Sequence, residues 1–238
     1  MIKILAIGNS YSQDATCMIE LLDKNIMVRN LYIGGCSLEM HYDNIKDDLK
    51  NYRYEELGAK EREENISIKE ALEEENWDYV TVQQVSSKSG MKETFEPYIN
   101  ELIRYIKKIS NAEIILHETW AYNNDTTHPG FINYDNNEKK MYESIITTYK
   151  YYSDKYNLRI IPTGHLIEKL RKTDIFNKNN GGLDLCRDEW QHLSLNYGRL
   201  AASSLWVYFF TGKIPSFFDS INSLPINTIR NCLLKINE

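Results

Sequence analysis

The sequence predicts an α/β fold in which helices cover both faces of a parallel sheet. Two observations support this fold class: short apolar runs typical of buried strands recur along the chain, and segments with helical spacing lie between them. Alternating strands and helices favour parallel strands joined by right-handed crossovers, which gives a doubly wound sheet. Five strands are predicted, at residues 2–7, 27–33, 79–84, 113–118 and 158–163.

Helices are predicted between these strands and after the last one. Ser67 and Glu70 have the spacing of a capping box, which marks where one helix begins. A later helix closes at Gly212, and the last one follows Pro225. The predicted helical segments are 14–24, 67–77, 95–110, 139–156, 196–212 and 225–237.

Residues 48–65 fit this alternation poorly. The segment is compatible with a β-hairpin around Gly58 or with a charged helix, and we interpret it as an inserted excursion. Elsewhere the chain has no repeat, no low-complexity tract and no Pro/Gly-rich linker. Residues 1–238 are therefore expected to form a single domain.

Charge and hydropathy exclude several functional classes. The net charge is −6 and basic residues do not cluster with aromatic ones, so nucleic acid is not an expected partner. The longest apolar stretch, LAASSLWVYFF, is shorter than the ~20 residues that span a bilayer, so no membrane contact is expected. The N-terminal apolar run is too short for a signal peptide, which predicts a cytoplasmic protein.

The cysteines are far apart in the chain and form no C-x-x-C pair. They are expected to be reduced, buried thiols rather than ligands of a zinc ion or parts of a redox motif. We accordingly expect neither a metal nor a cofactor. The four cysteines are Cys17, Cys36, Cys186 and Cys232.

The stretch ILAIGNSYSQDA places two serines just where the first strand ends. In open parallel sheets, ligands bind beyond the carboxyl ends of the strands. Gly8 permits a tight turn there, and the N-terminus of the following helix favours a developing negative charge. Ser10 or Ser12 is therefore a candidate nucleophile, while either could equally be a helix N-cap.

A serine nucleophile needs a base, and His192 is the best placed of the five histidines. Asp188 and Glu189 precede it by about one turn, so a carboxylate is available to orient the imidazole. His41 and His128 are expected in surface loops instead.

Together, IGNSYS and the late acid–histidine motif resemble the SGNH (GDSL-like) hydrolases. That resemblance implies a three-layer, flavodoxin-like α/β/α fold and a serine esterase that needs no cofactor. Ser10 matches the family's nucleophile and His192 its base, with Asn9 where the family's Asp usually stands. This GNS variant, with VQQVS and ETWAY further on, resembles an uncharacterised branch of the family.

The resemblance also implies an oxyanion hole. It would use the Ser10 N–H and a glycine N–H after the second strand, for which Gly35 is preferred and Gly34 is the alternative. The family's third donor is an Asn after the third strand, where this chain reads VTVQQVSSKSG. Gln84 is the preferred replacement, with Gln83 or a serine such as Ser86 as alternatives.

The family's acid precedes its histidine by three residues, which corresponds to Glu189 here. Asp188 is preferred, because a one-residue insertion in a loop is easily absorbed, and Glu189 remains the alternative. Trp120 and Tyr122 follow the fourth strand and are candidates for the substrate wall. The resemblance implies a small ester substrate, including O-acetylated carbohydrates.

Two other classes compete with this interpretation. One is a non-catalytic relative or a flavodoxin-like module that binds a ligand at the first strand–helix turn. The other is a metal-dependent hydrolase, but its candidate ligands lack a recognised metal-binding spacing. Those candidates are His117, Glu118, Asp125 and His128.

Overall fold

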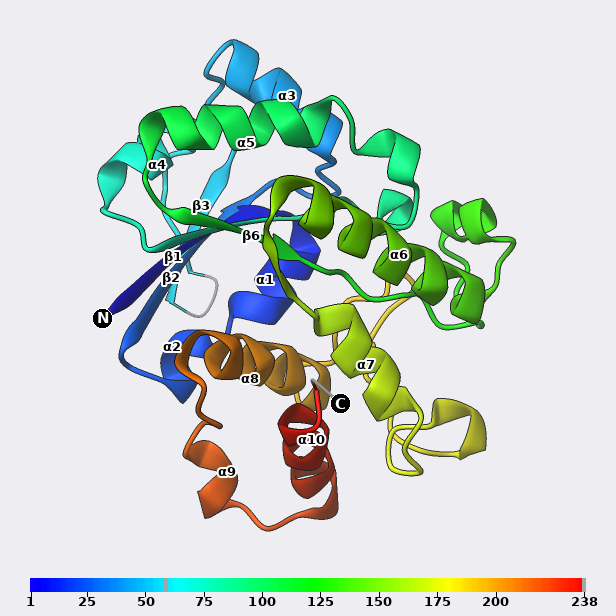
Figure 1. Ribbon diagram of the computed structural model, residues 1–238. Helices are drawn as coiled ribbons and strands as arrows, with labels where there is room; N and C mark the ends of the chain where they lie inside the picture. The colour runs from blue at the N-terminus through cyan, green and yellow to red at the C-terminus, as the bar shows by residue number, and fades with distance from the viewer. Residues whose placement is uncertain (58–59, 237–238) are drawn as a thin grey trace.

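The computed structural model describes residues 1–57 and 60–236, and a central sheet organises them (Figure 1). Five strands are parallel and adjacent in the order β2-β1-β5-β6-β7. They coincide with the five predicted runs, so the predicted α/β fold is confirmed. These strands are β1 (Ile2–Gly8), β2 (Ile26–Tyr32), β5 (Tyr79–Val82), β6 (Glu113–His117) and β7 (Arg159–Ile161).

Two further strands correct the predicted count from five to seven. β3 (Arg53–Glu56) pairs antiparallel with β2, and β4 (Lys60–Glu61) pairs antiparallel with β3. Of the two interpretations of residues 48–65, the paired strands agree with the β-hairpin and not with the charged helix, and they extend the edge of the sheet. Gly58, around which the hairpin was expected to turn, lies outside the described residues, as does residue 59. These two strands are short and charged, so they lack the apolar runs that predict the other strands.

Helices cover both faces of the sheet, as right-handed crossovers require (Figure 1). On one face lie α1 (Ser10–Thr16), α2 (Ile19–Leu22), α7 (Thr163–Arg171), α8 (Tyr197–Thr211) and α10 (Leu224–Leu234), with the short α9 (Phe217–Ser220) beside α10. On the other face lie α3 (Leu38–Lys46), α4 (Ile68–Glu74), α5 (Tyr98–Ile109) and α6 (Glu138–Tyr156). Short 3₁₀ helices occupy 86–88, 92–94, 129–134 and 178–180.

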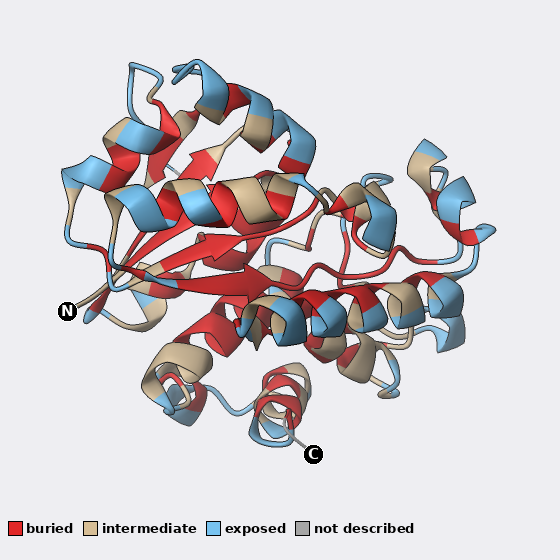
Figure 2. Cartoon of the chain, turned by 45° about the horizontal axis from the view of Figure 1, so that its top comes forward, coloured by how far each residue is buried: buried red, intermediate tan, exposed pale blue. Residues whose placement is uncertain are grey.

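The parallel strands are buried between these two layers (Figure 2). Burial on both faces explains why the strands read as continuous apolar runs rather than alternating ones. The predicted capping box is present: the Ser67 hydroxyl accepts the Glu70 N–H, and the Glu70 carboxylate accepts the Ser67 N–H. No helix in the described residues has the length and apolar character that crossing a bilayer requires.

The order of the strands determines where a ligand site belongs. The chain passes from β1 to β2 on one side and then crosses back to β5 on the other. At this reversal the connections diverge and leave a crevice beyond the carboxyl end of β1. Asn9 and Ser10 lie in that position.

Candidate active site

Gly8 ends β1 at the tightest point of the first turn. A Cβ at this position would lie 2.5 Å from Ser12 Oγ and 3.1 Å from Gln83 Cδ. Only glycine therefore lets α1 begin directly against the end of the strand. The turn places Ser10, the first residue of α1, at the carboxyl edge of the sheet.

Asn9 caps α1 and ties the turn to neighbouring segments. Its Oδ1 accepts hydrogen bonds from the Tyr11 N–H at 2.9 Å and from Gln83 Nε2 at 2.8 Å. Its Nδ2 donates to the Cys36 carbonyl oxygen at 3.0 Å. An amide performs both roles, whereas a carboxylate would only accept. Asn9 thus fixes Ser10 relative to the segments that follow β2 and β5.

The two serines of the turn have different environments. Ser12 is buried, and its hydroxyl lies 2.8 Å from the Asn9 carbonyl oxygen and 2.7 Å from Asn30 Oδ1. Ser10 is half-buried and lines a pocket, and its hydroxyl has no partner in the part of the chain that the structure describes. Ser10 is therefore the serine that a ligand in the pocket can reach.

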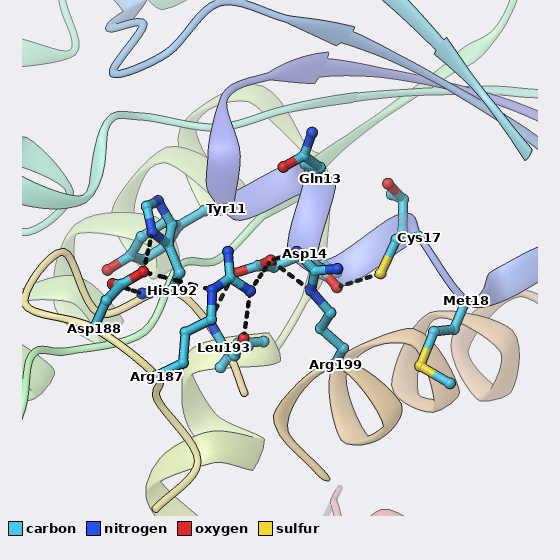
Figure 3. A network of polar contacts seen from close by, with 12 residues as sticks. Tyr11, Gln13, Asp14, Cys17, Met18, Arg187, Asp188, His192, Leu193 and Arg199 are labelled. Atoms are coloured by element: carbon cyan, nitrogen blue, oxygen red, sulfur yellow. Dashed lines mark hydrogen bonds and ion pairs between the residues drawn. The ribbon is translucent and has the colours of Figure 1, made fainter. Parts of the chain in front are cut away.

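Asp188 and His192 form a hydrogen-bonded pair within one loop (Figure 3). Nδ1 of His192 lies 2.7 Å from Asp188 Oδ2, and the His192 N–H donates to Asp188 Oδ1 at 3.1 Å. Burial raises the pKa of the Asp188 carboxyl, but hydrogen bonds from His192 outweigh it and hold that pKa below its ordinary value. The carboxylate keeps a proton on Nδ1, which leaves Nε2 free to act as a base. Glu189, the alternative acid, is exposed.

Ser10 and His192 line the same pocket, at the carboxyl ends of β1, β2 and β5. Its volume is about 420 Å³. Gly35 has a φ of +64°, which glycine adopts without strain, and it lies with Gly34 on the wall that follows β2. The lining residues are Asn9, Ser10, Tyr11, Tyr32, Gly34, Gly35, Val85, Ser86, Ser87, His128, Trp190 and His192.

The two glutamines predicted as oxyanion donors do not line this pocket. Gln84 Nε2 donates to the carbonyl oxygen of Thr94 at 3.0 Å. Gln83 Nε2 donates to Asn9 Oδ1, and its Oε1 lies 2.6 Å from His117 Nδ1. Both amides stabilise buried loops rather than face a ligand, which corrects the expectation for these positions.

Trp120 and Tyr122 are likewise buried and do not form the substrate wall expected of them. The Trp120 ring stacks on Tyr11 with centroids 3.9 Å apart, and its Nε1 donates to the Gln191 carbonyl oxygen at 2.8 Å. The Tyr122 hydroxyl lies 2.7 Å from Ser86 Oγ. Both rings support residues that line the pocket.

His128 and Trp190 are pocket residues that the sequence analysis missed. His128, expected in a surface loop, lies at the start of a 3₁₀ helix with its ring 4.9 Å from that of Trp190. The Trp190 side chain is 56% exposed although it lines the pocket. The Pro-Gly pair after His128 indicates a turn, but nothing in the spacing relates that turn to Ser10.

The candidate metal ligands do not converge. His117 and Glu118 are buried and bonded to protein groups, Asp125 forms an ion pair with Lys178, and His128 lines the pocket. Across residues 1–57 and 60–236, no three His, Cys, Asp or Glu side chains are grouped to hold a metal ion.

A larger pocket, of about 590 Å³, lies elsewhere on the molecule. Its lining mixes acidic groups such as Glu138 with basic groups such as Arg171, which form an ion pair at 3.3 Å. It contains no serine, cysteine or histidine. Of these two pockets, the smaller one holds nucleophilic and basic side chains together.

Comparison with known proteins shows which family the chain belongs to. Residues 3–221 match the family described as "Domain of unknown function (DUF4886)". The chain belongs to the DUF4886 family. A crystal structure of a DUF4886 protein from Bacteroides uniformis is 31% identical, covers 100% of this chain and 96% of its own, and gives a TM-score of 0.86. No curated protein matches the chain.

Other solved structures share the fold of this DUF4886 chain at lower identity. A candidate SGNH hydrolase from Slackia heliotrinireducens is 19% identical, with 88% of this chain and 98% of that one covered and a TM-score of 0.56. Axe2, an acetylxylan esterase from Geobacillus stearothermophilus, is 11% identical, with 88% and 94% covered and a TM-score of 0.56. These likenesses show that the fold is that of the SGNH hydrolases.

Proposed function

We propose that this DUF4886 protein is a serine hydrolase that cleaves small ester bonds. The observation that carries the proposal is the pocket itself: it is lined by an unpartnered serine hydroxyl and by a histidine held by a carboxylate. Nucleophile, base and orienting acid are the three parts that acyl transfer through a serine requires. Ser10, His192 and Asp188 take these roles.

The reaction proceeds in two stages. Ser10 Oγ attacks the acyl carbon while His192 Nε2 takes the serine proton, and His192 then protonates the departing alcohol. In the second stage His192 activates a water molecule, which releases the acid and restores Ser10. Asp188 holds the imidazole in one tautomer and stabilises it when it is charged.

Two backbone groups are suited to stabilise the oxyanion. The Ser10 N–H opens α1, and Gly35 lines the same pocket; neither backbone N–H has a hydrogen-bond partner within the described residues. Each such donor contributes roughly 3–4 kcal/mol of transition-state stabilisation in enzymes where it was removed. The positive end of the α1 dipole adds to the effect.

Ser86 replaces the glutamines as the third donor. The Gly130 N–H donates to His128 Nδ1 at 2.9 Å, so the neutral ring carries its proton on Nε2. Burial lowers the pKa of His128, which keeps the ring neutral. His128 Nε2 then donates to the Tyr122 hydroxyl at 3.3 Å, and that hydroxyl donates to Ser86 Oγ at 2.7 Å. Neither Tyr122 nor His128 accepts the Ser86 proton, so Ser86 can donate it to a ligand in the pocket.

The substrate class follows from the pocket walls. Tyr32 and the exposed Trp190 line the pocket together with Ser10, and aromatic rings suit a sugar ring or a short acyl chain. O-acetylated carbohydrates are accordingly the proposed substrates within the ester class, in line with the acetylxylan esterases that share the fold.

Hydrolysis of p-nitrophenyl acetate by wild type, Ser10→Ala and Ser12→Ala tests the proposal. Ser12 is a matched control because its hydroxyl lies two residues away but is buried outside the pocket. We expect loss of activity in Ser10→Ala and retention in folded Ser12→Ala. Equal activity in wild type and Ser10→Ala would contradict the mechanism, and an inactive wild type would favour the ligand-binding alternative.

A further inference from the structure

The Asp14 carboxylate is buried where α1 meets the loop that carries Asp188 and His192 (Figure 3). Asp14 lies one helical turn after Ser10 in α1. Its Oδ2 accepts the Leu193 N–H at 2.6 Å. The helix of the candidate nucleophile is thus bonded directly to the residue that follows His192.

Arg187 connects Asp14 to the other end of the same loop. Its Nη1 lies 3.3 Å from Asp14 Oδ1 and donates to the Leu193 carbonyl oxygen at 2.8 Å. Its backbone N–H donates to the carbonyl oxygen of His192, also at 2.8 Å. Both flanks of the Asp188–His192 loop, residue 187 before it and residue 193 after it, therefore meet at one carboxylate.

The Arg187 cation is shared between two acids. Its Nε lies 3.5 Å from Asp188 Oδ2, while its Nη1 contacts Asp14. Arg199 on α8 supplies a second cation to Asp14, with Nη2 at 2.7 Å from Oδ1. A cation that pairs only with Asp188 would weaken the support that Asp188 gives to a charged His192.

We infer that Asp14 is a positioning residue: it fixes the Asp188–His192 loop against α1 and draws the Arg187 cation away from Asp188. The inference rests on the proposed function, because it assigns Asp14 a role in setting the base of that mechanism. Asp14 itself does not line the pocket.

Neutralising Asp14 and neutralising Arg187 are expected to have opposite effects on the stability of the charged form of His192. Removing the Asp14 charge leaves Arg187 to pair with Asp188, so a charged His192 is stabilised less. Removing the Arg187 cation has the reverse effect, because Asp188 and Asp14 then act unopposed. An ion pair that has no influence on His192 predicts no change in either variant.

Few other ionisable groups face the loop. His128 stands across the pocket, and burial raises the pKa of the nearby thiols of Cys17 and Cys186 to about 11, which keeps both neutral at working pH. In the described residues, the charged groups on this loop and against it include Asp14, Arg187, Asp188, Glu189 and Arg199. The Tyr11 ring also packs against His192, and burial raises the Tyr11 pKa and so keeps that hydroxyl neutral.

The test measures kcat/KM for p-nitrophenyl acetate between about pH 5 and pH 8.5 in wild type, Asp14→Asn and Arg187→Met. We expect the acidic limb of the profile of kcat/KM against pH to move to lower pH by a few tenths of a unit in Asp14→Asn. In Arg187→Met it is expected to move to higher pH by a similar amount. A folded fraction that is constant with pH lowers the whole profile without moving its limb, so the folded fraction of each variant is measured at every pH. Arg187 is partly exposed, so Arg187→Met keeps the test decisive if Asp14→Asn folds poorly.

Asp14→Ala, which also removes the acceptor for Leu193, is expected to lower kcat by about 10²-fold with little change in KM. Limbs that stay at the wild-type pH in both charge variants would overturn the inference. His192→Ala distinguishes failure of the inference about Asp14 from failure of the proposed function. If His192→Ala abolishes hydrolysis while the limbs of the Asp14→Asn and Arg187→Met profiles stay at the wild-type pH, only the role of Asp14 fails. If His192→Ala is as active as wild type, the proposed function fails.

Discussion

The Tyr122 hydroxyl lies 2.7 Å from Ser86 Oγ, and of the two residues only Ser86 lines the pocket. His128 donates to the same tyrosine hydroxyl, so the tyrosine proton is directed to Ser86. The Tyr11 hydroxyl donates its own proton to the Trp190 carbonyl oxygen at 3.2 Å, and its pKa is raised by burial and lowered by a hydrogen bond from Ser86, so Tyr11 and a ligand are alternative acceptors for the Ser86 proton. A buried tyrosine thereby orients a pocket serine.

Replacing Ser86 tests this orientation. Ser86→Ala is expected to lower kcat for p-nitrophenyl acetate by about 10²-fold with KM nearly unchanged, as the loss of one oxyanion donor does. Tyr122→Phe is expected to cost less, because the Ser86 hydroxyl remains. In the double variant, Tyr122→Phe should add nothing to Ser86→Ala. Additive losses, or wild-type kcat in Ser86→Ala, would exclude Ser86 as a donor.

Gly8→Ala is expected to destabilise the protein by about 1–3 kcal/mol, because the added methyl overpacks the turn. The methyl would lie 2.5 Å from Ser12 Oγ and 2.9 Å from Ser12 Cβ. Combining it with Ser12→Ala removes the closer contact, so the double variant should lose less than the sum of the single variants. Urea unfolding measures all three; strict additivity would show that the contact is not the cause.

Glu118 predicts a pH-dependent stability. Burial raises the pKa of its carboxyl from 4.5 to about 8. The hydrogen bond from the His165 N–H to Glu118 Oε1, at 2.8 Å, acts in the opposite direction and lowers the pKa by less. The unfolded carboxyl releases its proton above about pH 4.5 while the folded one keeps it to about pH 8, so stability falls as pH rises through this window.

Glu118→Gln keeps an acceptor for the His165 N–H and removes the titration. Its melting temperature is expected to exceed that of wild type by a margin that grows from about pH 5 to about pH 8. Glu64→Gln, at an exposed position, is the matched control and should show no such trend. A constant difference between Glu118→Gln and wild type would mean that the folded carboxyl is already ionised at pH 5.

The parallel strands could be predicted because burial on both faces requires continuous apolar runs. The hairpin of β3 and β4 was one of two structures that the sequence allowed for residues 48–65, and the choice between them depends on partners distant in sequence. Glu55 is only 2% exposed, and its carboxylate accepts a hydrogen bond from Asn30 Nδ2 at 2.6 Å. A glutamate in a charged segment gives no sign in the sequence that such a partner exists.

The candidate site was predictable to a similar extent. Asp188 and His192 are close in sequence, so their contact follows from local spacing. The orientations of Gln83 and Gln84 do not, since each amide is held by residues far along the chain. His128 reaches the pocket through the loop after β6, and no sequence pattern near His128 indicates that it lines the pocket.

The most direct test of the account is covalent labelling with an alkyl fluorophosphonate, read by intact mass and peptide mapping. Ser10 Oγ would bond to phosphorus as fluoride leaves, with His192 taking the serine proton. We expect one adduct per chain, on Ser10, with full labelling of folded Ser12→Ala and none of Ser10→Ala. An unlabelled wild type, or an adduct that persists in Ser10→Ala, would contradict it.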